Sequence, residues 1–490
     1  MNKPTNKEFK GSYFFLFILF FIILIDFVDL PIISFIIKNI FLIVFLSYNI
    51  FNYKKNNPER WLLNPAVLAS IFTFLLGFVI TNYIHFVPDT EASKLLYKQL
   101  GSDHFPILNY TMTLIILSAM LMWLGYNSKF GDRLYNFLLK KPLGLTKYFR
   151  KELKPNMAFI YTLIVISVFA RLYAIQIGIF GFAQSPKTLS ENIAIALIIN
   201  SAGQLINFSL ILIAIKFFKE GFNFNYRLTL AIIVLIEIYF GLLSGVKSAV
   251  IFPVAILFVC YYLVHKKIHK GFIVATIILL VAAYTIIEPF RIIRMRDANF
   301  QSSPGYIASS MMDAYSLNKS RKIVYGDEDI FTSIVTRNNY LLAAAKAVDF
   351  SDNSGLDTQS PDFLEKIYTV PLQAFIPRIF WRSKPVEDFG KWFSVVVWGG
   401  TPTTSVAMTP IGFLYFAGGI TAVLIGFFVF GIMQRFIWNF YLGGGGQLLI
   451  YFGFLSSVIL IDSSINGTLV SWIRNFPIII ILQTFLLKRN

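Results

Sequence analysis

The residues best suited to chemistry are cations gathered in one long polar stretch, residues 289–408, which lies between apolar segments of membrane length. They are Arg291, Arg294, Arg337, Arg378, Arg382 and Lys384. A guanidinium is always charged and binds a phosphate through two parallel hydrogen bonds. This group of residues therefore indicates a site for a phosphate-bearing ligand at a membrane surface.

The spacing of these arginines gives two local arrangements. Arg291 and Arg294 are three residues apart on an expected helical continuation of the preceding apolar segment, so they share one face and point to the same site. The alternative is a pair of cations that anchors the membrane end of the helix. Arg378 and Arg382 flank the aromatic residues at 380 and 381, and these cations bind either a substrate or lipid headgroups.

Charged residues inside apolar segments are the second group, because an ionisable group at membrane depth is costly. Arg474 is too deep in the last apolar segment for simple snorkelling, which favours a ligand or an internal partner. Lys247 lies in a turn between two such segments, as a substrate contact or as a snorkelling lysine. Arg171 and Glu237 lie within apolar segments too, and for Glu237 a structural pairing, a protonated acid and a coupling role all stay open.

Familiar catalytic motifs are missing from the sequence. We find no nucleotide-binding loop, zinc-protease motif, nucleophile elbow or dinucleotide fingerprint. His265 and His269 are four residues apart but lie in a lysine-rich loop, which favours a solvated face over a metal site. The single cysteine, Cys260, excludes an internal disulfide and a cysteine-based metal site. We expect neither a metal nor a cofactor.

The composition sets the class of protein. Hydrophobic residues make up 56% and charged residues only 14% of the chain, values typical of a polytopic membrane protein. The net charge of +17 does not indicate nucleic-acid binding, because the cations fall mostly in short loops between apolar segments.

Apolar segments of roughly 17 to 25 residues cross a bilayer as helices. The sequence predicts an all-α protein with about twelve of them. The predicted spans are 12–29, 32–51, 63–84, 107–126, 156–177, 190–215, 228–245, 249–264, 271–288, 410–432, 446–462 and 468–487. The chain thus divides into residues 1–288 with nine spans, the loop 289–408, and residues 409–490 with three spans.

Lysine and arginine are unequally shared between the two sets of short loops. By the positive-inside rule both termini are cytoplasmic and the loop 289–408 is periplasmic. Inside that loop, helical patterns near 304–318, 328–348 and 361–376 predict short amphipathic helices that lie on the membrane surface or cap a cavity.

Two stretches of the chain resemble a known family. Residues 375–385, FIPRIFWRSKP, and residues 409–415, TPIGFLY, with Gly418 and Gly419, are similar to the outer-loop signature of the O-antigen and exopolysaccharide repeat-unit polymerases, the Wzy-type proteins. The turn 245–247, the stretch 336–338 and Arg474 in the final span resemble that family as well.

The resemblance implies a bacterial inner-membrane glycosyltransferase with a GT-C-like fold, which polymerises undecaprenyl-diphosphate-linked oligosaccharide units without a nucleotide sugar or a metal. It implies membrane lipids as surroundings, and a chain-length regulator and a flippase as possible partners. Arg291, Arg378 and Arg474 match the family's basic positions as catalytic residues, and the expected substrate-binding residues are Arg294, Arg337, Arg382, Lys247 and Lys384. Relatives usually carry arginine where this chain has Lys247, so a bidentate phosphate contact is not expected there.

Two other functions stay open. An O-antigen ligase has the same architecture and donor but usually carries a histidine in the large loop, and residues 289–408 contain none. A flippase or transporter would show repeat-related halves and broken helices, whereas this chain has one oversized loop in one half only. The carboxylates of Asp349, Asp362 and Glu365 have no feature that singles out a general base.

The topology is testable by cysteine labelling. In a Cys260→Ala background, Ser354→Cys should react with a membrane-impermeant thiol reagent added from the periplasmic side, because loop 289–408 is predicted to lie outside. A cysteine placed within residues 127–155 is the control and should react from the cytoplasmic side alone. Labelling of residue 354 from the cytoplasm only would invert the topology.

Overall fold

The described part of the chain is helical. The computed structural model describes residues 20, 24, 30–86, 91–139, 149, 152–181, 193–221, 223–287, 290, 304–319, 339–354, 361–376, 381, 389–400, 405–459 and 465–487. These residues contain no strand, and their one extended backbone pairing is an isolated bridge between Pro155 and Leu487. The predicted all-α class is confirmed.

The helices up to residue 287 are α2 (Pro31–Asn56), η2 (Trp61–Leu63), α3 (Pro65–Ala69), η3 (Ser70–Gly77), η4 (Ile80–Phe86), α4 (Glu91–Leu100), α5 (Phe105–Asn127), α6 (Phe130–Leu139), α7 (Met157–Gln176), α9 (Ile193–Gln204), α10 (Ile206–Glu220), α11 (Phe224–Ser244), α12 (Lys247–His265), α13 (Lys270–Ala282) and η7 (Ala283–Ile287). Those after it are α15 (Pro304–Lys319), α17 (Tyr340–Asn353), α18 (Phe363–Phe375), α19 (Phe389–Trp392), η8 (Phe393–Val397), α20 (Thr409–Gly443), α21 (Gln447–Ile459) and α22 (Ile465–Leu486).

Most predicted spans correspond to helices. Within the described ranges, 9 segments are long and apolar enough to cross a membrane, and α13 and α21 are shorter apolar helices at two further predicted positions. The first predicted span, 12–29, lies outside the described residues except for Phe20 and Leu24. The chain is therefore a polytopic helical membrane protein, and the count of twelve stays a prediction.

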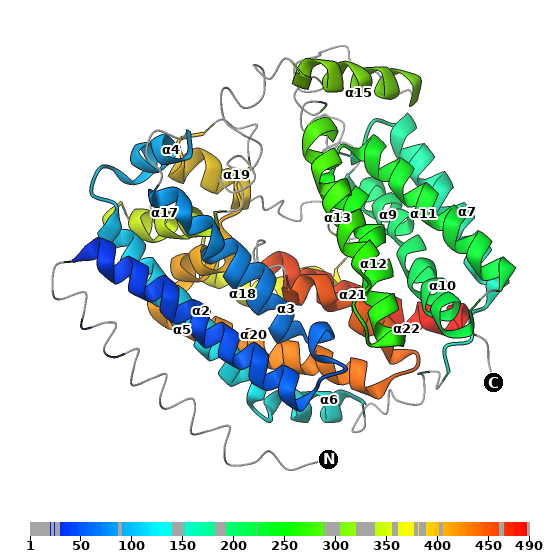
Figure 1. Cartoon of the computed structure of the whole chain (residues 1–490), viewed down its shortest axis with the longest axis horizontal. Coiled ribbons are helices and arrows are strands. Elements are labelled where there is room, and N and C mark those ends of the chain that lie inside the picture. The colour runs from blue at the N-terminus through cyan, green and yellow to red at the C-terminus, as the bar shows by residue number, and fades with distance from the viewer. Residues whose placement is uncertain are drawn as a thin grey trace.

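Two ends of the molecule can be defined from Figure 1, which shows α4 in the upper part and α6 at the bottom. We call them the α4 end and the α6 end. At the α6 end, the backbone N–H of Asn156 donates to Leu486 at 2.8 Å, and the Tyr135 hydroxyl donates to Gln447 at 2.6 Å. Burial raises the pKa of Tyr135, so its hydroxyl stays a donor at neutral pH.

The helices predicted in loop 289–408 are present as α15, α17 and α18. Two match the predicted ranges 304–318 and 361–376, and the third is described only from Asn339 onward, with α17 beginning at Tyr340. α17 does not lie on a surface. It buries one side against α5 and α20, with an alanine-rich face that includes Ala344, Ala345 and Ala347.

α20 is two helices joined at a sharp break. Gly418 is extended, and Gly419 has a φ of 60°, a left-handed conformation that favours glycine. A Cβ at Gly426 would lie 2.5 Å from a methyl group of Leu414, so the short first helix folds back toward the second. The predicted span 410–432 straddles this break and is wrong in its bounds, because residues 420–443 form the membrane-length helix, about 36 Å long.

α5 and the second part of α20 pack unusually closely. A Cβ at Gly125 would lie 2.0 Å from the backbone oxygen of Phe428, and a Cβ at Gly431 would lie 2.0 Å from that of Met122. Small residues at a helix crossing let two backbones approach, which favours van der Waals contact where lipid supplies no hydrophobic force between helices. These two glycines therefore set the distance between α5 and α20.

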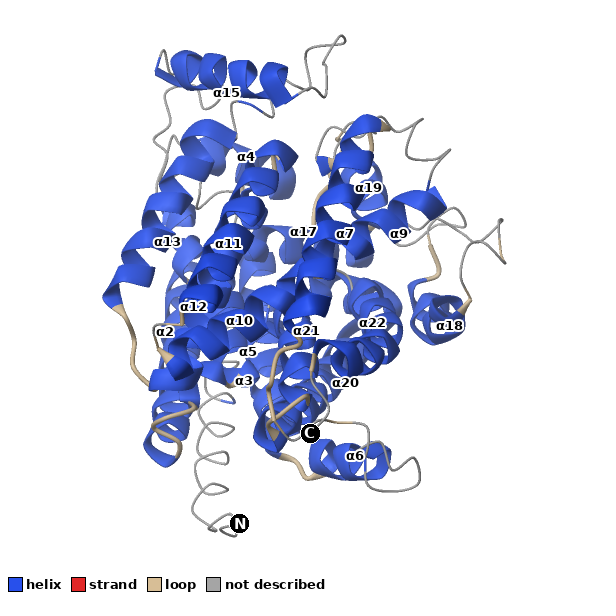
Figure 2. Cartoon of the chain, turned by 90° about the vertical axis from the view of Figure 1, so that its right-hand side faces the viewer, coloured by secondary structure: helices blue, strands red, loops and turns tan. Residues whose placement is uncertain are grey.

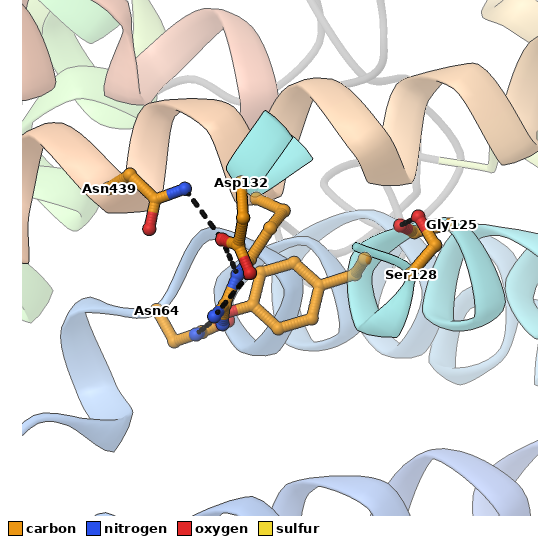
Figure 3. A network of polar contacts seen from close by, with 7 residues as sticks. Asn64, Gly125, Ser128, Asp132 and Asn439 are labelled. Carbon is orange, nitrogen blue, oxygen red and sulfur yellow. Dashed lines mark hydrogen bonds and ion pairs between the residues drawn. The ribbon is translucent and has the colours of Figure 1, made fainter. Parts of the chain in front are cut away.

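A polar network closes the same crossing at the α6 end (Figure 3). Asp132 of α6 accepts from Arg435 at 2.8 and 3.3 Å and from the Asn439 amide at 2.8 Å. The Arg435 guanidinium lies 5.6 Å from the ring centre of Tyr126, whose buried hydroxyl accepts from the Asn64 amide. The network connects α3, α5, α6 and α20, and every group named in it has a partner.

The α5–α20 crossing is testable with matched glycine variants. Gly431→Ala should lower the free energy of unfolding by about 1–3 kcal/mol, because the added methyl group meets backbone that cannot move aside. Thermal unfolding in detergent, followed by intrinsic fluorescence, measures the change. The control is Gly305→Ala in α15, where a Cβ meets nothing within 4 Å and helix propensity favours alanine. Equal effects of both variants would contradict the packing argument.

Candidate functional site

The structure describes two of the eight predicted site residues, Lys247 and Arg474. The other six lie outside the described residues and stay predictions: Arg291, Arg294, Arg337, Arg378, Arg382 and Lys384. Described neighbours of three of them nevertheless carry information. Ala374 precedes Arg378 by four residues, and Phe290 precedes Arg291 directly and Arg294 by four residues.

Arg474 lies on the face of α22 that meets loop helix α18. Trp472 is buried and its indole N–H donates to Ser457 of α21 at 2.6 Å, which directs that face of α22 toward α21. Residues two apart on a helix point about 200° from each other, so Arg474 faces away from α21. Its Nε donates to the backbone oxygen of Ala374 at 3.3 Å, and α18 packs along α22.

This contact brings the predicted loop motif toward the last span. α18 ends at Phe375, and residues 375–385 are the stretch that resembles the polymerase signature. Arg474 is half-buried and sits nine residues inside the start of α22 at Ile465. The sequence predicted an internal partner or a ligand for Arg474, and the α18 backbone is one such partner.

Lys247, predicted to lie in the turn 245–247, is the first residue of α12. α11 ends at Ser244, whose hydroxyl accepts from the backbone N–H of Val246 at 3.1 Å, and Gly245 has a φ of 67°. A Cβ at Gly181 would lie 2.4 Å from the Ser244 backbone oxygen, so the segment after α7 packs against this turn. Lys247 is thus half-buried at the connection between two spans.

A buried ion pair joins two spans that the sequence did not connect. Arg171 of α7 and Glu237 of α11 approach to 2.5 Å, and their side chains are 12% and 8% exposed. Arg171 also donates to the backbone oxygen of Gly203 at 2.7 Å, and its guanidinium lies 5.2 Å from the ring centre of Phe240. Each charge is thereby compensated, which a charge at membrane depth requires.

The carbonyl of Gly203 marks a break in the predicted span 190–215. α9 ends at Gln204 and α10 begins at Ile206, so carbonyl groups near the end of α9 lack partners from a continuing helix. The hydroxyl of Ser167 donates to the Gly203 oxygen at 2.6 Å, beside Arg171. Arg171 therefore pairs with the carboxylate of Glu237 and also donates to a carbonyl near the end of α9.

The ion pair borders the start of the long loop. Phe290 is fully buried in a cluster with Phe240 and Leu243. Because Phe240 also lies against the Arg171 guanidinium, the residue that precedes Arg291 belongs to the same cluster as the ring beside Arg171. The depths of Arg171 and Glu237, five and seven residues from the ends of their helices, were the available sequence signal for this pairing.

A second polar arrangement ties loop helix α17 to the first part of α20. The Tyr415 hydroxyl donates to both oxygens of Asp352, at 3.0 and 3.1 Å, and lies 3.0 Å from the Tyr110 hydroxyl. Tyr415 is buried and Asp352 is exposed. Tyr415 belongs to the TPIGFLY stretch of the resemblance. Asp352 was not among the loop carboxylates that the sequence analysis considered.

α17 is also joined to the N-terminal bundle. The Asn339 side chain lies 3.2 Å from His85 Nε2, and its oxygen accepts from the backbone N–H of Leu342 at 3.1 Å. Deeper in the bundle, the fully buried Lys38 donates to the backbone oxygen of Asn109 at 3.1 Å. The loop helices are therefore fixed to the spans by polar contacts on several sides.

Comparison with known proteins gives no assignment: the chain matches no family model, no curated protein and no solved structure.

The Arg171–Glu237 pair is testable by a double-mutant cycle. Arg171→Gln and Glu237→Gln should each lower the free energy of unfolding by about 3–5 kcal/mol, because each leaves the other charge buried without compensation. The double variant should lose less than the sum of the two. As a control, Glu152→Gln removes an exposed pair with Lys154 and should leave the unfolding midpoint unchanged. Additive losses from the two single variants would contradict the pairing.

Proposed function

We propose that this protein polymerises oligosaccharide repeat units carried on undecaprenyl diphosphate, as a metal-independent glycosyltransferase at the periplasmic face of the bacterial inner membrane. The observation that carries the proposal is the contact of Arg474 with α18. It brings a cation of the last span to the loop helix that leads into Arg378 and the residues of the resemblance.

In the proposed reaction, an acceptor sugar hydroxyl attacks the anomeric carbon of the donor. A new glycosidic bond forms, the bond from that carbon to the diphosphate breaks, and the hydroxyl proton is released. Negative charge develops on the departing lipid diphosphate, and arginines positioned in advance stabilise it. Arg474, Arg378 and Arg291 are the residues to which we assign this role, with Arg294, Arg337, Arg382, Lys247 and Lys384 holding the substrate.

The described residues support this assignment through positioning. Arg474 donates a hydrogen bond to the α18 backbone, which holds its guanidinium beside the loop helix that leads to Arg378. The buried pair of Arg171 and Glu237 holds the aromatic cluster that contains Phe290, next to Arg291. Arg291 thus directly follows a loop residue that is packed against the spans, and Arg378 follows another by four residues.

An O-antigen ligase is less well supported. The loop contains no histidine, and His85, which lies beside Asn339 of the loop, belongs to the N-terminal bundle, as does His104. His104 is buried beside Phe105, with ring centres 4.8 Å apart, and His85 is held by Asn339.

One observation favours a flippase as second candidate. The interruption between α9 and α10 leaves a helix end inside an apolar segment, next to the buried Arg171–Glu237 pair. Broken helices beside intramembrane charges are typical of transporters. A flippase would move the lipid-linked unit across the membrane and leave it chemically unchanged, which an assay of bond formation distinguishes.

The test uses purified full-length protein with lipid-diphosphate-linked oligosaccharide as the sole sugar source and excess EDTA. We expect longer lipid-linked chains, because the arginines supply the positive charge that a divalent cation would supply at the diphosphate. Arg474→Ala should lower the rate about 10²- to 10³-fold, and Arg474→Lys should already lose most of the activity because a lysine lacks the planar fork. Arg291→Lys and Arg378→Lys should behave alike.

The matched control is Arg227→Lys near the N-terminus of α11, and this variant should leave the rate unchanged. A strict need for a divalent cation would remove the arginine-centred mechanism. In proteoliposomes, unchanged substrate together with its transport across the membrane would favour the flippase. With a lipid A core added as a second acceptor, transfer to it without lengthening would favour the ligase.

A further inference from the structure

α6 has one face fixed to the protein. It follows α5 after a turn at Ser128, and Figures 1 and 2 both place it across the lower end of the molecule. A Cβ at Gly131 would lie 2.7 Å from the Cβ of Arg435, and Asp132 pairs with that arginine. Tyr135 donates to Gln447 on the same side. α20 and the start of α21 therefore hold one side of this helix.

The opposite face of α6 carries two exposed aromatic rings and a cation. Phe130 and Phe137 are 54% and 59% exposed, although α6 is not one of the apolar spans. They are seven residues apart and so point in nearly the same direction, with Arg133 between them. The Arg133 guanidinium is exposed and lies 5.6 Å from the ring centre of Phe130. This face is apolar and positively charged at once.

The sequence around α6 adds more positive charge. Residues 129–154 contain eight cations, Lys129, Arg133, Lys140, Lys141, Lys147, Arg150, Lys151 and Lys154. The same range has two acidic residues, Asp132 and Glu152, and each is already paired. Pro155, directly after this stretch, pairs with Leu487.

We propose that α6 lies in the plane of the membrane interface and that Lys129 and Arg133 form a binding site for acidic phospholipid headgroups. Phe130 and Phe137 insert among the lipids of the leaflet at the α6 end, and the cations contact the phosphates. A lipid surface is the one occupant that offers an apolar layer to both rings and negative charge beside it. The site is distinct from the proposed glycosyl-transfer site.

The cations should confer a preference for acidic lipid. Each cation near an anionic membrane surface is worth a factor of about five in affinity, so Lys129→Gln with Arg133→Gln should weaken binding of phosphatidylglycerol about 25-fold. Native mass spectrometry of the full chain, titrated with phosphatidylglycerol or with phosphatidylcholine, measures retention of each lipid. The matched control, Lys267→Gln, removes an exposed cation from the loop between α12 and α13 and should change retention little.

The insertion of the rings is tested separately. In nanodiscs, an environment-sensitive dye on Asn136→Cys, in a Cys260→Ala background, should report an apolar setting that deepens when phosphatidylglycerol replaces part of the phosphatidylcholine. Phe130→Ser with Phe137→Ser should abolish that response. Phe224→Ser, which changes a 72% exposed ring at the start of α11, should preserve it.

Equal retention of the two lipids, or a dye that stays in water in both bilayers, would overturn the proposal. The same holds if the response appears only when a cytoplasmic protein is added, since a protein would then cover this face. Unfolding midpoints close to that of the unsubstituted chain show that each variant is folded.

Discussion

The near-contact of two helix backbones, α5 with the second part of α20, is the constraint on which the rest of the architecture depends. Gly125 and Gly431 allow an approach that no side chain would permit. α17 packs against α5 and the first part of α20, and α6 is held to the second part by the ion pair of Asp132 with Arg435. In a lipid environment, where apolar surfaces attract one another little, such close packing and satisfied polar groups are the main forces between helices.

The loop helices α17 and α18 pack against different spans. α17 buries an alanine-rich face against α5 and α20. The hydrogen bond of Tyr415 with Asp352 connects α17 to the first part of α20, which folds back at Gly419. α18 instead contacts α22 through Arg474. The loop helices α17 and α18 are thus part of the helical body, and under the proposed function a substrate would meet groups held by several spans.

The sequence predicted those features that depend on local patterns. Hydropathy located eleven of the predicted apolar segments, because membrane-length runs need no knowledge of their neighbours. The turn at Gly245 and the helices α15 and α18 were also confirmed. Contacts between distant residues were missed: neither the pairing of Arg171 with Glu237 nor the break of α20 follows from hydrophobic periodicity. Of the candidate site, the placement of Arg474 beside a partner agrees with expectation, and the loop arginines stay predictions.

The wide separation of α5 and α20 along the chain has a consequence for biosynthesis. Asp132 and Arg435 are 303 residues apart. At about 5–20 residues per second, roughly 15 to 60 s pass between the synthesis of the carboxylate and that of its guanidinium partner. During this interval Gly125 of α5 has no helix packed against it, and Asp132 of α6 lacks its arginine partner. The N-terminal bundle must therefore persist as an incomplete intermediate, and the insertion machinery or surrounding lipids have to shield it until α20 arrives.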